Sequence, residues 1–284
     1  MTTPINLDSD DPIAVSFGGG LNSSALLWLM HERGIRPDVV MFADTGAEKP
    51  STYDHVRRVS DWAAGLGWDF VVVSRTAYPP KGANPADQPT SLEDECIRDG
   101  RMPSMAYGSA RCSTEWKRRP MHRFLKQLPL AKKAWAEGRR VQQWLGIDAD
   151  EAHRSANLQD TKQFTFHRPL VDWDVGRDEC REALARSPFG SVGKSACFFC
   201  PSSRRSEILA LRAESPSLLE RALAIEDLSQ GYNKSVRGLG RTWSWRSYLE
   251  AEDRQGKFDF GAFPEPPPMP CGCADDSGDD IEAT

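Results

Sequence analysis

The stretch VSFGGGLNSSALLWLM, residues 15–30, decides how this chain folds. Three glycines at residues 18–20 stand between a short apolar run and an amphipathic one, and Asn22, Ser23 and Ser24 follow them. Glycine weakens the interior of a strand or helix because it loses the most backbone freedom on folding. The stretch therefore predicts a strand, a turn that side chains would obstruct, and a helix.

Strands and helices alternate on either side of that turn. Strands are expected within residues 13–17, 37–46, 68–75, 139–151 and 166–173, and helices within 23–34, 51–67, 112–128, 177–187, 202–214 and 217–229. Apolar, β-branched strands that alternate with helices favour a parallel sheet covered on both faces. The predicted fold class is α/β: an open, mostly parallel sheet with helices on both faces, followed by a helical C-terminal region.

Three segments are expected from this pattern. Residues 1–177 would form a nucleotide-binding α/β domain, and residues 178–262 a helical region that carries a C-x-x-C pair. Residues 263–284 are rich in proline and then acidic, which is typical of a flexible tail.

The composition is that of a soluble globular protein. The 284 residues are 39% hydrophobic and 27% charged, with a formal net charge of -5. No apolar run is long enough for a membrane span, and the start of the chain lacks a signal peptide, so a cytoplasmic location is expected. Thiols stay reduced there, so the seven cysteines are expected to be ligands or reactive groups rather than disulfides.

A glycine-rich turn between a first strand and a first helix is where α/β proteins bind phosphate. Backbone N–H groups can point at the ligand, and the helix N-terminus adds positive potential. Ser16, Ser23 and Ser24 would add hydroxyl groups. The spacing fits neither G-x-G-x-x-G nor the Walker motif, which disfavours a Rossmann dehydrogenase and a P-loop nucleotidase. The alternative is a tight turn that binds no ligand.

The turn resembles the pyrophosphate loop, S-G-G-x-D-S, of the N-type ATP pyrophosphatases, the adenine nucleotide alpha hydrolase superfamily. Gly18 stands at the first serine, Gly19 and Gly20 at the glycines, Asn22 at the aspartate and Ser23 at the last serine. Asn22 lacks the negative charge of that aspartate, which puts any magnesium-related role of this position in question.

Three later segments extend the resemblance to the phosphoadenosine phosphosulfate reductase branch of this superfamily. They are FADTGAEKPSTYDHV at 42–56, GIDADEAHR at 146–154 and RPLVDW at 168–173, in the family order. The resemblance implies a fold of that class and binding of ATP with magnesium. The chain also resembles DNA phosphorothioation and RNA thiolation enzymes. That resemblance implies that the protein transfers sulfur.

The resemblance also implies roles for particular residues. Asp44 and Glu48 would lie beside the ribose or the substrate, and Lys117 would face the phosphates. Glu151 and Arg154 would face the same crevice. The plainer alternatives are a capping aspartate, a solvated glutamate and a surface ion pair.

A C-x-x-C pair, Cys197 and Cys200, has the spacing at which two thiolates share one metal. Cys96 and Cys112 are candidate partners, and Cys112 is also a candidate catalytic thiol. The resemblance favours a [4Fe–4S] cluster over zinc, which composition alone does not separate. A redox-active dithiol and unconnected thiols are the alternatives, and Cys180 reads as a buried helix residue.

The tail carries two further thiols, Cys271 and Cys273. Sulfonucleotide reductases have an E-C-G-[LI]-H-like motif on such a tail, and PCGCADD does not match it. The mismatch weakens reduction of phosphoadenosine phosphosulfate as the activity, and leaves open a tail thiol that carries a persulfide.

The segment from Lys117 to Arg140 holds nine Lys/Arg and a single acid. Phe124 and Trp135 lie within it, and cations with aromatic side chains are typical of nucleic-acid binding. Further cations and indoles follow at Arg204, Arg205, Arg237, Arg241, Arg246, Trp243 and Trp245. The alternative is a solvated helix face together with residues that bind the phosphates of the nucleotide.

These observations predict an ATP-dependent adenylating sulfurtransferase that activates a substrate oxygen with release of pyrophosphate. Expected partners are the nucleotide, a nucleic-acid acceptor, a cysteine desulfurase or other sulfur donor, and a second copy of the chain, with no membrane. One rival is a phosphoadenosine phosphosulfate reductase. The other is a non-catalytic nucleic-acid-binding protein with a zinc-stapled helical part.

Overall fold

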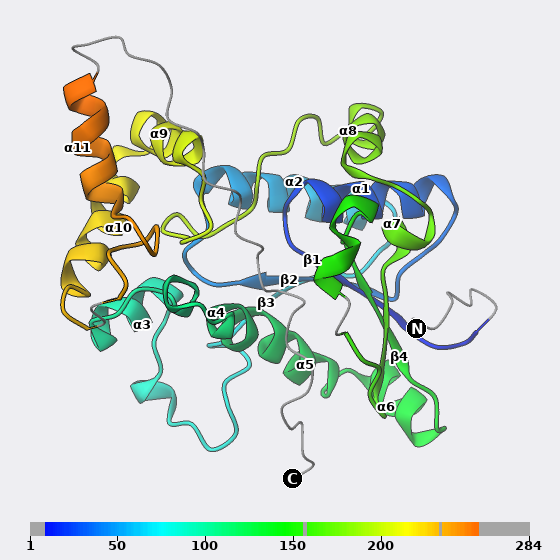
Figure 1. The fold of residues 1–284 in the computed structure, drawn as a ribbon. Helices are drawn as coiled ribbons and strands as arrows, with labels where there is room; N and C mark the ends of the chain where they lie inside the picture. Colours follow the sequence, from blue (N-terminus) through cyan, green and yellow to red (C-terminus); the bar gives the residue numbers. More distant parts are fainter. Residues whose placement is uncertain (1–8, 156–157, 233–234, 256–284) are drawn as a thin grey trace.

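The computed structural model describes residues 9–155, 158–232 and 235–255. Five parallel strands form one sheet in the order β3-β2-β1-β4-β5 (Figure 1). The strands are β1 Ile13–Phe17, β2 Val39–Asp44, β3 Phe70–Ser74, β4 Val141–Leu145 and β5 Phe164–His167. The predicted open parallel sheet is confirmed.

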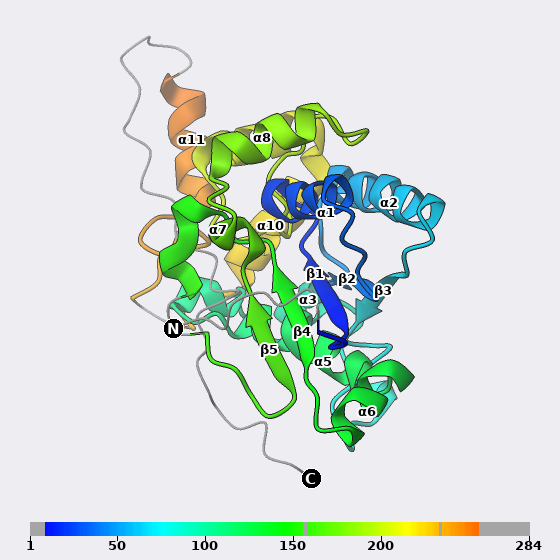
Figure 2. The same cartoon turned by 90° about the vertical axis from the view of Figure 1, so that its right-hand side faces the viewer.

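Helices cover both faces of the sheet, as Figure 2 shows. One face carries α1 Leu21–Glu32, α2 Pro50–Gly65, α7 Pro169–Asp172 and α8 Arg177–Ala185. The opposite face carries α5 Arg119–Leu125 and α6 Pro129–Ala136. The α5 helix continues α4, Arg111–Ser113, through a π-helical turn at Thr114–Arg118.

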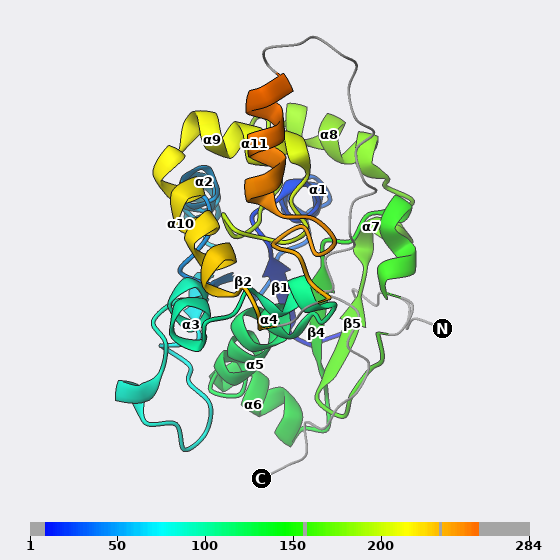
Figure 3. The same cartoon turned by 60° about the vertical axis from the view of Figure 1, so that its left-hand side comes forward.

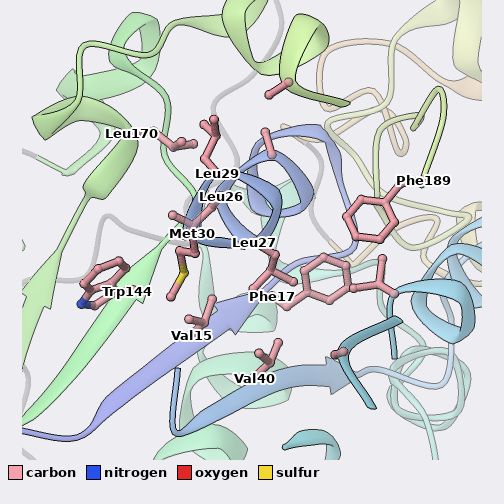
Figure 4. Packing of buried hydrophobic residues seen from close by; sticks show 14 of the residues in the cluster. Val15, Phe17, Leu26, Leu27, Leu29, Met30, Val40, Trp144, Leu170 and Phe189 are labelled. Atoms are coloured by element: carbon pink, nitrogen blue, oxygen red, sulfur yellow. The ribbon is translucent and has the colours of Figure 1, made fainter. Parts of the chain in front are cut away.

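The alternation of side chains along β1 explains why each face has its own core. Val15 and Phe17 are buried against α1 on one face, where Leu26 and Leu27 meet them (Figure 4). Ala14 belongs to the cluster on the other face, with α5 and α6. Successive side chains of a strand point to opposite faces, so β1 is apolar on both.

A third cluster joins the C-terminal helices to α3, Leu92–Asp99. The helices are α9 Arg205–Glu214, α10 Pro216–Leu228 and α11 Trp245–Gln255, which Figure 3 shows stacked beside α3. The helices expected within 202–214 and 217–229 are confirmed. None of the helices in the described ranges is long and apolar enough to span a lipid bilayer.

The packing does not change at the predicted boundary after residue 177. Helix α8 begins at that point, and its Cys180 and Leu184 belong to the core around α1, as does Phe189. The first buried residue after α8 that belongs to the C-terminal cluster is Cys197. The tail expected at 263–284 lies outside the described residues.

One local prediction differs from the structure, and some helices were not predicted. The strand expected within 166–173 ends at His167, and residues 169–172 form helix α7. Pro169 stands at the first turn of that helix, where its fixed φ favours helix and its missing N–H is not needed. Helices α3 and α11 were not among the expected elements.

Glu226 on α10 organises the segment that leads into α11. Its side chain is 0% exposed, and its oxygens accept hydrogen bonds from the N–H groups of Leu239, Trp245 and Arg246 at 2.8, 2.9 and 3.1 Å. The hydroxyl of Ser244 donates a fourth at 2.6 Å. A buried carboxylate is stable when donors surround it in this way.

Candidate nucleotide and thiol site

The order of the strands reverses between β1 and β4. In open parallel sheets the ligand crevice lies outside the carboxyl ends of the strands at such a point. The glycine turn follows β1 there, and Gly146 follows β4. The glycine turn within residues 15–30 therefore lies at the place where open parallel sheets bind ligands.

Hydrogen bonds fix the glycine turn from within. The Gly20 carbonyl accepts from the Ser24 N–H at 3.0 Å and from the Ser23 and Ser24 hydroxyls at 3.1 and 2.9 Å. The Gly18 N–H donates to Ser23 Oγ at 3.2 Å. Gly20, the N-cap residue of α1, has no side chain to cap the helix, so the first N–H groups and the positive end of α1 are left for an anion.

The three glycines of the turn differ in what the lack of a side chain allows. Gly18 and Gly20 line the cavity described below, and Gly19 does not. Gly19 has φ +75°, and a Cβ there would lie 3.2 Å from Thr52 Cγ2 and 3.4 Å from Phe42. Its lack of a side chain serves the backbone turn and the packing of α2, rather than room for a ligand.

Gly146 is a residue that sequence reasoning missed. A Cβ at this position would lie 2.6 Å from Ser23 Cα and 2.8 Å from the Ser23 nitrogen. The backbone after β4 therefore touches the first turn of α1 directly. The signal in the sequence was that Gly146 begins the family-like segment GIDADEAHR at 146–154, which was not read as a contact with the glycine turn.

One large cavity, about 1850 Å³, opens at this crevice. Its lining includes Ser16, Gly18, Gly20, Asn22 and Ser23 of the first strand and turn. Among the described residues, its cations are Lys117, Arg118, Lys126, Lys132, Lys162, Arg177, Arg181, Lys194 and Arg204, and its acids are Glu151, Asp160 and Glu207. The excess of cations favours a ligand that carries several phosphates.

Ser24 lies behind the turn rather than in the cavity. Its Oγ is 2.7 Å from His55 Nε2, and both side chains are buried. Burial lowers the pKa of His55 to about 4, so the ring is neutral at pH 7. The Ser24 hydroxyl donates to the Gly20 carbonyl, so it accepts the Nε2 proton of His55.

A second polar chain lies on the wall of the cavity. Gln143 Nε2 donates to Ser16 Oγ at 2.9 Å, and His122 Nε2 lies 2.9 Å from Gln143 Oε1. Burial lowers the pKa of His122 to about 4, which leaves a neutral ring that donates through Nε2. The hydroxyl proton of Ser16 is thereby directed away from Gln143.

Lys117 and Glu48 form a partly buried ion pair at the cavity. Lys117 Nζ lies 3.0 Å from Glu48 Oε1, the Glu48 side chain is 0% exposed, and the Thr45 hydroxyl donates to the same oxygen at 3.2 Å. Glu48 Oε2 is buried without a hydrogen-bond partner among the described residues. Lys117 lines the cavity from the π-helical turn, a distortion found often at functional sites.

Asp44 organises the loop after β2. Its Oδ1 accepts from the Gly46 N–H and from the Tyr53 hydroxyl, both at 2.8 Å. Neither Asp44 nor Glu48 lines the large cavity, and Glu48 instead borders a second pocket of about 470 Å³. Their direct contact with a ribose stays a prediction.

The four candidate ligand thiols share one apolar cluster. Cys96 and Cys197 are buried in it, and Cys112 and Cys200 pack against it. Cys197 pairs with Glu48 in an isolated β-bridge, and its Sγ lies 3.3 Å from Thr45 Oγ1. Burial raises the pKa of the Cys197 and Cys96 thiols.

Two pairs of thiols lie near enough to influence each other's pKa. Cys96 interacts electrostatically with Cys112, and Cys197 with Cys200. Four sulfurs suit a [4Fe–4S] or zinc centre in kind. No group of three Cys, His, Asp or Glu side chains in the described ranges is close enough together to hold a metal ion. Three of the four, Cys112, Cys197 and Cys200, line the cavity that also holds the glycine turn.

The remaining predicted site residues are placed as follows. Glu151 lines the cavity, 4.0 Å from Arg177. Arg154 lies in a 3₁₀ helix, Ala149–Ser155, and its side chain is outside the described part, as are Cys271 and Cys273. Cys180 is buried in the core around α1, as expected.

Two of the four aromatic residues predicted to stack on bases are buried, whereas Trp135 lines the large cavity. Phe124 is only 9% exposed and packs beneath the sheet. Trp135 donates from Nε1 to the Gln163 carbonyl at 2.8 Å, and Trp245 is 0% exposed. The expectation that these rings stack on bases is wrong for Phe124 and Trp245, because both rings are buried in the protein core.

Comparison with models of known protein families shows the family to which the chain belongs. A family model for the phosphoadenosine phosphosulfate reductase domain matches residues 12–177, more than half of the chain. The chain belongs to this family. The resemblance inferred from the sequence motifs is thereby confirmed. No curated protein matches the sequence.

Among solved structures, this member of the phosphoadenosine phosphosulfate reductase family is similar to the U34-tRNA thiolase NcsA from Methanococcus maripaludis with its [4Fe–4S] cluster. The TM-score is 0.41 at 14% identity, over 89% of this chain and 83% of that chain.

Proposed function

We propose that this protein is an ATP-dependent sulfurtransferase that adenylates a substrate oxygen, releases pyrophosphate and replaces that oxygen with sulfur. One observation carries the proposal: the glycine turn and the thiols of Cys112, Cys197 and Cys200 line the same cavity. In this proposal the residues that bind the phosphates and the thiols that handle sulfur share one cavity.

The first step needs positioning and charge rather than a side-chain nucleophile. The main-chain N–H groups at the start of α1 would bind the β- and γ-phosphates, with Lys117 and the other cavity cations neutralising their charge. The acceptor oxygen attacks the α-phosphorus, the bond to the β-phosphate oxygen breaks, and pyrophosphate leaves with that electron pair. The acceptor then carries AMP on its oxygen.

In the second step a sulfur nucleophile attacks the atom that bears this oxygen, and AMP leaves with the oxygen. Cys96, Cys112, Cys197 and Cys200 would hold a [4Fe–4S] cluster, or a zinc ion, once the two pairs close on one centre. Such a cluster would supply bound sulfur for transfer. The buried Glu48 beside Cys197 and Lys117 links the thiol side of the cavity to the phosphate side.

The nature of the acceptor belongs to the same proposal. A cavity of about 1850 Å³ exceeds the roughly 300–1,000 Å³ of ordinary small-molecule sites. Its excess of cations suits an acceptor that carries phosphates, such as a nucleic acid, in addition to ATP. We further propose that a cysteine desulfurase or a similar donor supplies the sulfur.

The test is the fate of ATP in the purified protein. Pyrophosphate and AMP should form from ATP when an RNA or DNA acceptor is supplied together with a sulfur source, and Lys117→Met should abolish their formation. Lys133→Met is the matched control, because Lys133 is an exposed lysine of the same basic segment outside the cavity lining. Sulfite release from phosphoadenosine phosphosulfate without ATP turnover would favour the reductase instead, and no turnover of either nucleotide would favour a binding protein.

A further inference from the structure

Asn22, which stands where the pyrophosphate loop has aspartate, is bound to a carboxylate from a distant part of the chain. It is the second residue of α1 and lines the cavity. Its Nδ2 donates to Oδ2 of Asp148 at 2.8 Å. Asp148 follows β4 by three residues, on the other side of the point where the strand order reverses.

Asp148 is held firmly behind the turn. It is 0% exposed, and its Oδ1 accepts the N–H of Glu151 at 2.9 Å. Each oxygen of the carboxylate therefore has a donor, which a buried charge requires. The first turn of α1, with its positive end, lies beside it and favours a negative charge. Asn22 itself carries no charge, but it contacts the carboxylate of Asp148 directly.

The hydrogen bond to Asp148 also decides how the Asn22 amide is oriented. With Nδ2 donating to Asp148, Oδ1 forms no hydrogen bond to any residue in the described ranges. Turning the amide over would place Oδ1 against a carboxylate oxygen, and two acceptors repel each other. Oδ1 is therefore the end of Asn22 that is left for a ligand in the cavity.

We propose that Asn22 and Asp148 together replace the single loop aspartate. Asp148 is a positioning residue that orients the amide, and Asn22 Oδ1 accepts a hydrogen bond from the water shell of the Mg²⁺ ion that accompanies the nucleotide phosphates. This inference rests on the proposed function, because its ligand is the magnesium nucleotide. The turn itself then presents no negative charge to the phosphates.

Exchange of the two residues tests the pair. Four full-length proteins are compared: the wild type, Asn22→Asp, Asp148→Asn, and the double variant that carries both changes. The probe is α,β-methylene-ATP, which cannot release pyrophosphate, and its affinity is measured by calorimetry with and without Mg²⁺. A thermal melt of each protein reports the structural part of the interaction.

The single change Asn22→Asp places two carboxylates about 2.8 Å apart, so one of them must bind a proton. We expect at least a tenfold loss of magnesium-nucleotide affinity, which recovers as the pH falls. The double variant again has one carboxylate and one amide, and should return to within about threefold of the wild type. Asp148→Asn, in which either amide can turn over, should lie between them.

Three results would overturn the proposal. They are wild-type affinity in Asn22→Asp, a double variant no better than Asn22→Asp, and a double variant that recovers its melting temperature without its affinity. The last result would make the pair a structural contact only. If the wild type itself does not bind the probe, the proposed function fails, which is distinct from a wild type that binds without coupling between the two positions.

Discussion

Substituting Gly146 by alanine should damage nucleotide binding by displacing Ser23, a residue of the glycine turn. The new Cβ would lie 2.6 Å from Ser23 Cα and 2.8 Å from the Ser23 nitrogen. Carbon atoms pack at roughly 3.5–4.0 Å, so the backbone of one segment must move by about 1 Å. Helix α1 is packed in the core by Leu26 and Leu27, which resists the movement.

The size of the effect follows from that displacement. Overpacking of this kind costs about 1–3 kcal/mol of folding stability. A shift of about 1 Å in the N–H groups that bind phosphate should weaken nucleotide affinity about 10- to 100-fold. The assays are calorimetric titration with α,β-methylene-ATP and urea denaturation of the same preparations.

Gly65→Ala is the matched control. A Cβ at Gly65, the last residue of α2, meets nothing within 4 Å, so affinity should not change and stability should be equal or slightly higher. A folded Gly146→Ala protein with wild-type nucleotide affinity would refute the argument that contact with Gly146 sets the shape of the glycine turn.

Glu226→Ala should lower the free energy of unfolding by about 2–4 kcal/mol, because four hydrogen-bond donors lose their buried acceptor. Glu220→Ala, on the exposed side of the same helix, should change the free energy of unfolding little. Equal denaturation midpoints for the two variants would contradict this role. Anaerobically purified Cys197→Ser protein should lack iron and acid-labile sulfide, or zinc. Cys180→Ala, in the core around α1, should keep its metal content. Unchanged metal content in Cys197→Ser would refute the cluster assignment. Burial lowers the pKa of His122 from 6.5 to about 4, so the unfolded chain binds the extra proton between these values, and stability is full above pH 6.5 and falls toward pH 4. The contribution is on the order of 2–3 kcal/mol, and His122→Gln should flatten this part of the pH profile; an unchanged slope would show that the loss comes from other groups.

The sheet could be predicted from the sequence because its signals are local. The apolar strands at 13–17 and 70–74 and the helix that begins after the glycines each carry their own pattern within a short window. The short helix α7 was missed because an apolar run of a few residues reads equally as a strand. Only the proline at its start indicated a helix.

The site was predictable where a motif is contiguous and not where it depends on distant contacts. The glycine turn was recognised from its three contiguous glycines and its resemblance to the pyrophosphate loop, and the C-x-x-C pair from its spacing. Gly146 and Asp148 contact the turn from more than 100 residues away, so the segment GIDADEAHR that contains them could be recognised but their contacts with the turn could not. Phe124 and Trp245 show the opposite failure, since composition does not tell which side of a helix or loop an aromatic ring occupies.

The most direct test of the central claim is a crystal structure of the protein with α,β-methylene-ATP and Mg²⁺. The account predicts that phosphate oxygens lie about 3 Å from main-chain nitrogens between residues 18 and 24, with the rest of the nucleotide in the cavity that Cys197 and Cys200 also line. A nucleotide bound elsewhere, with the glycine turn free of phosphate, would contradict it.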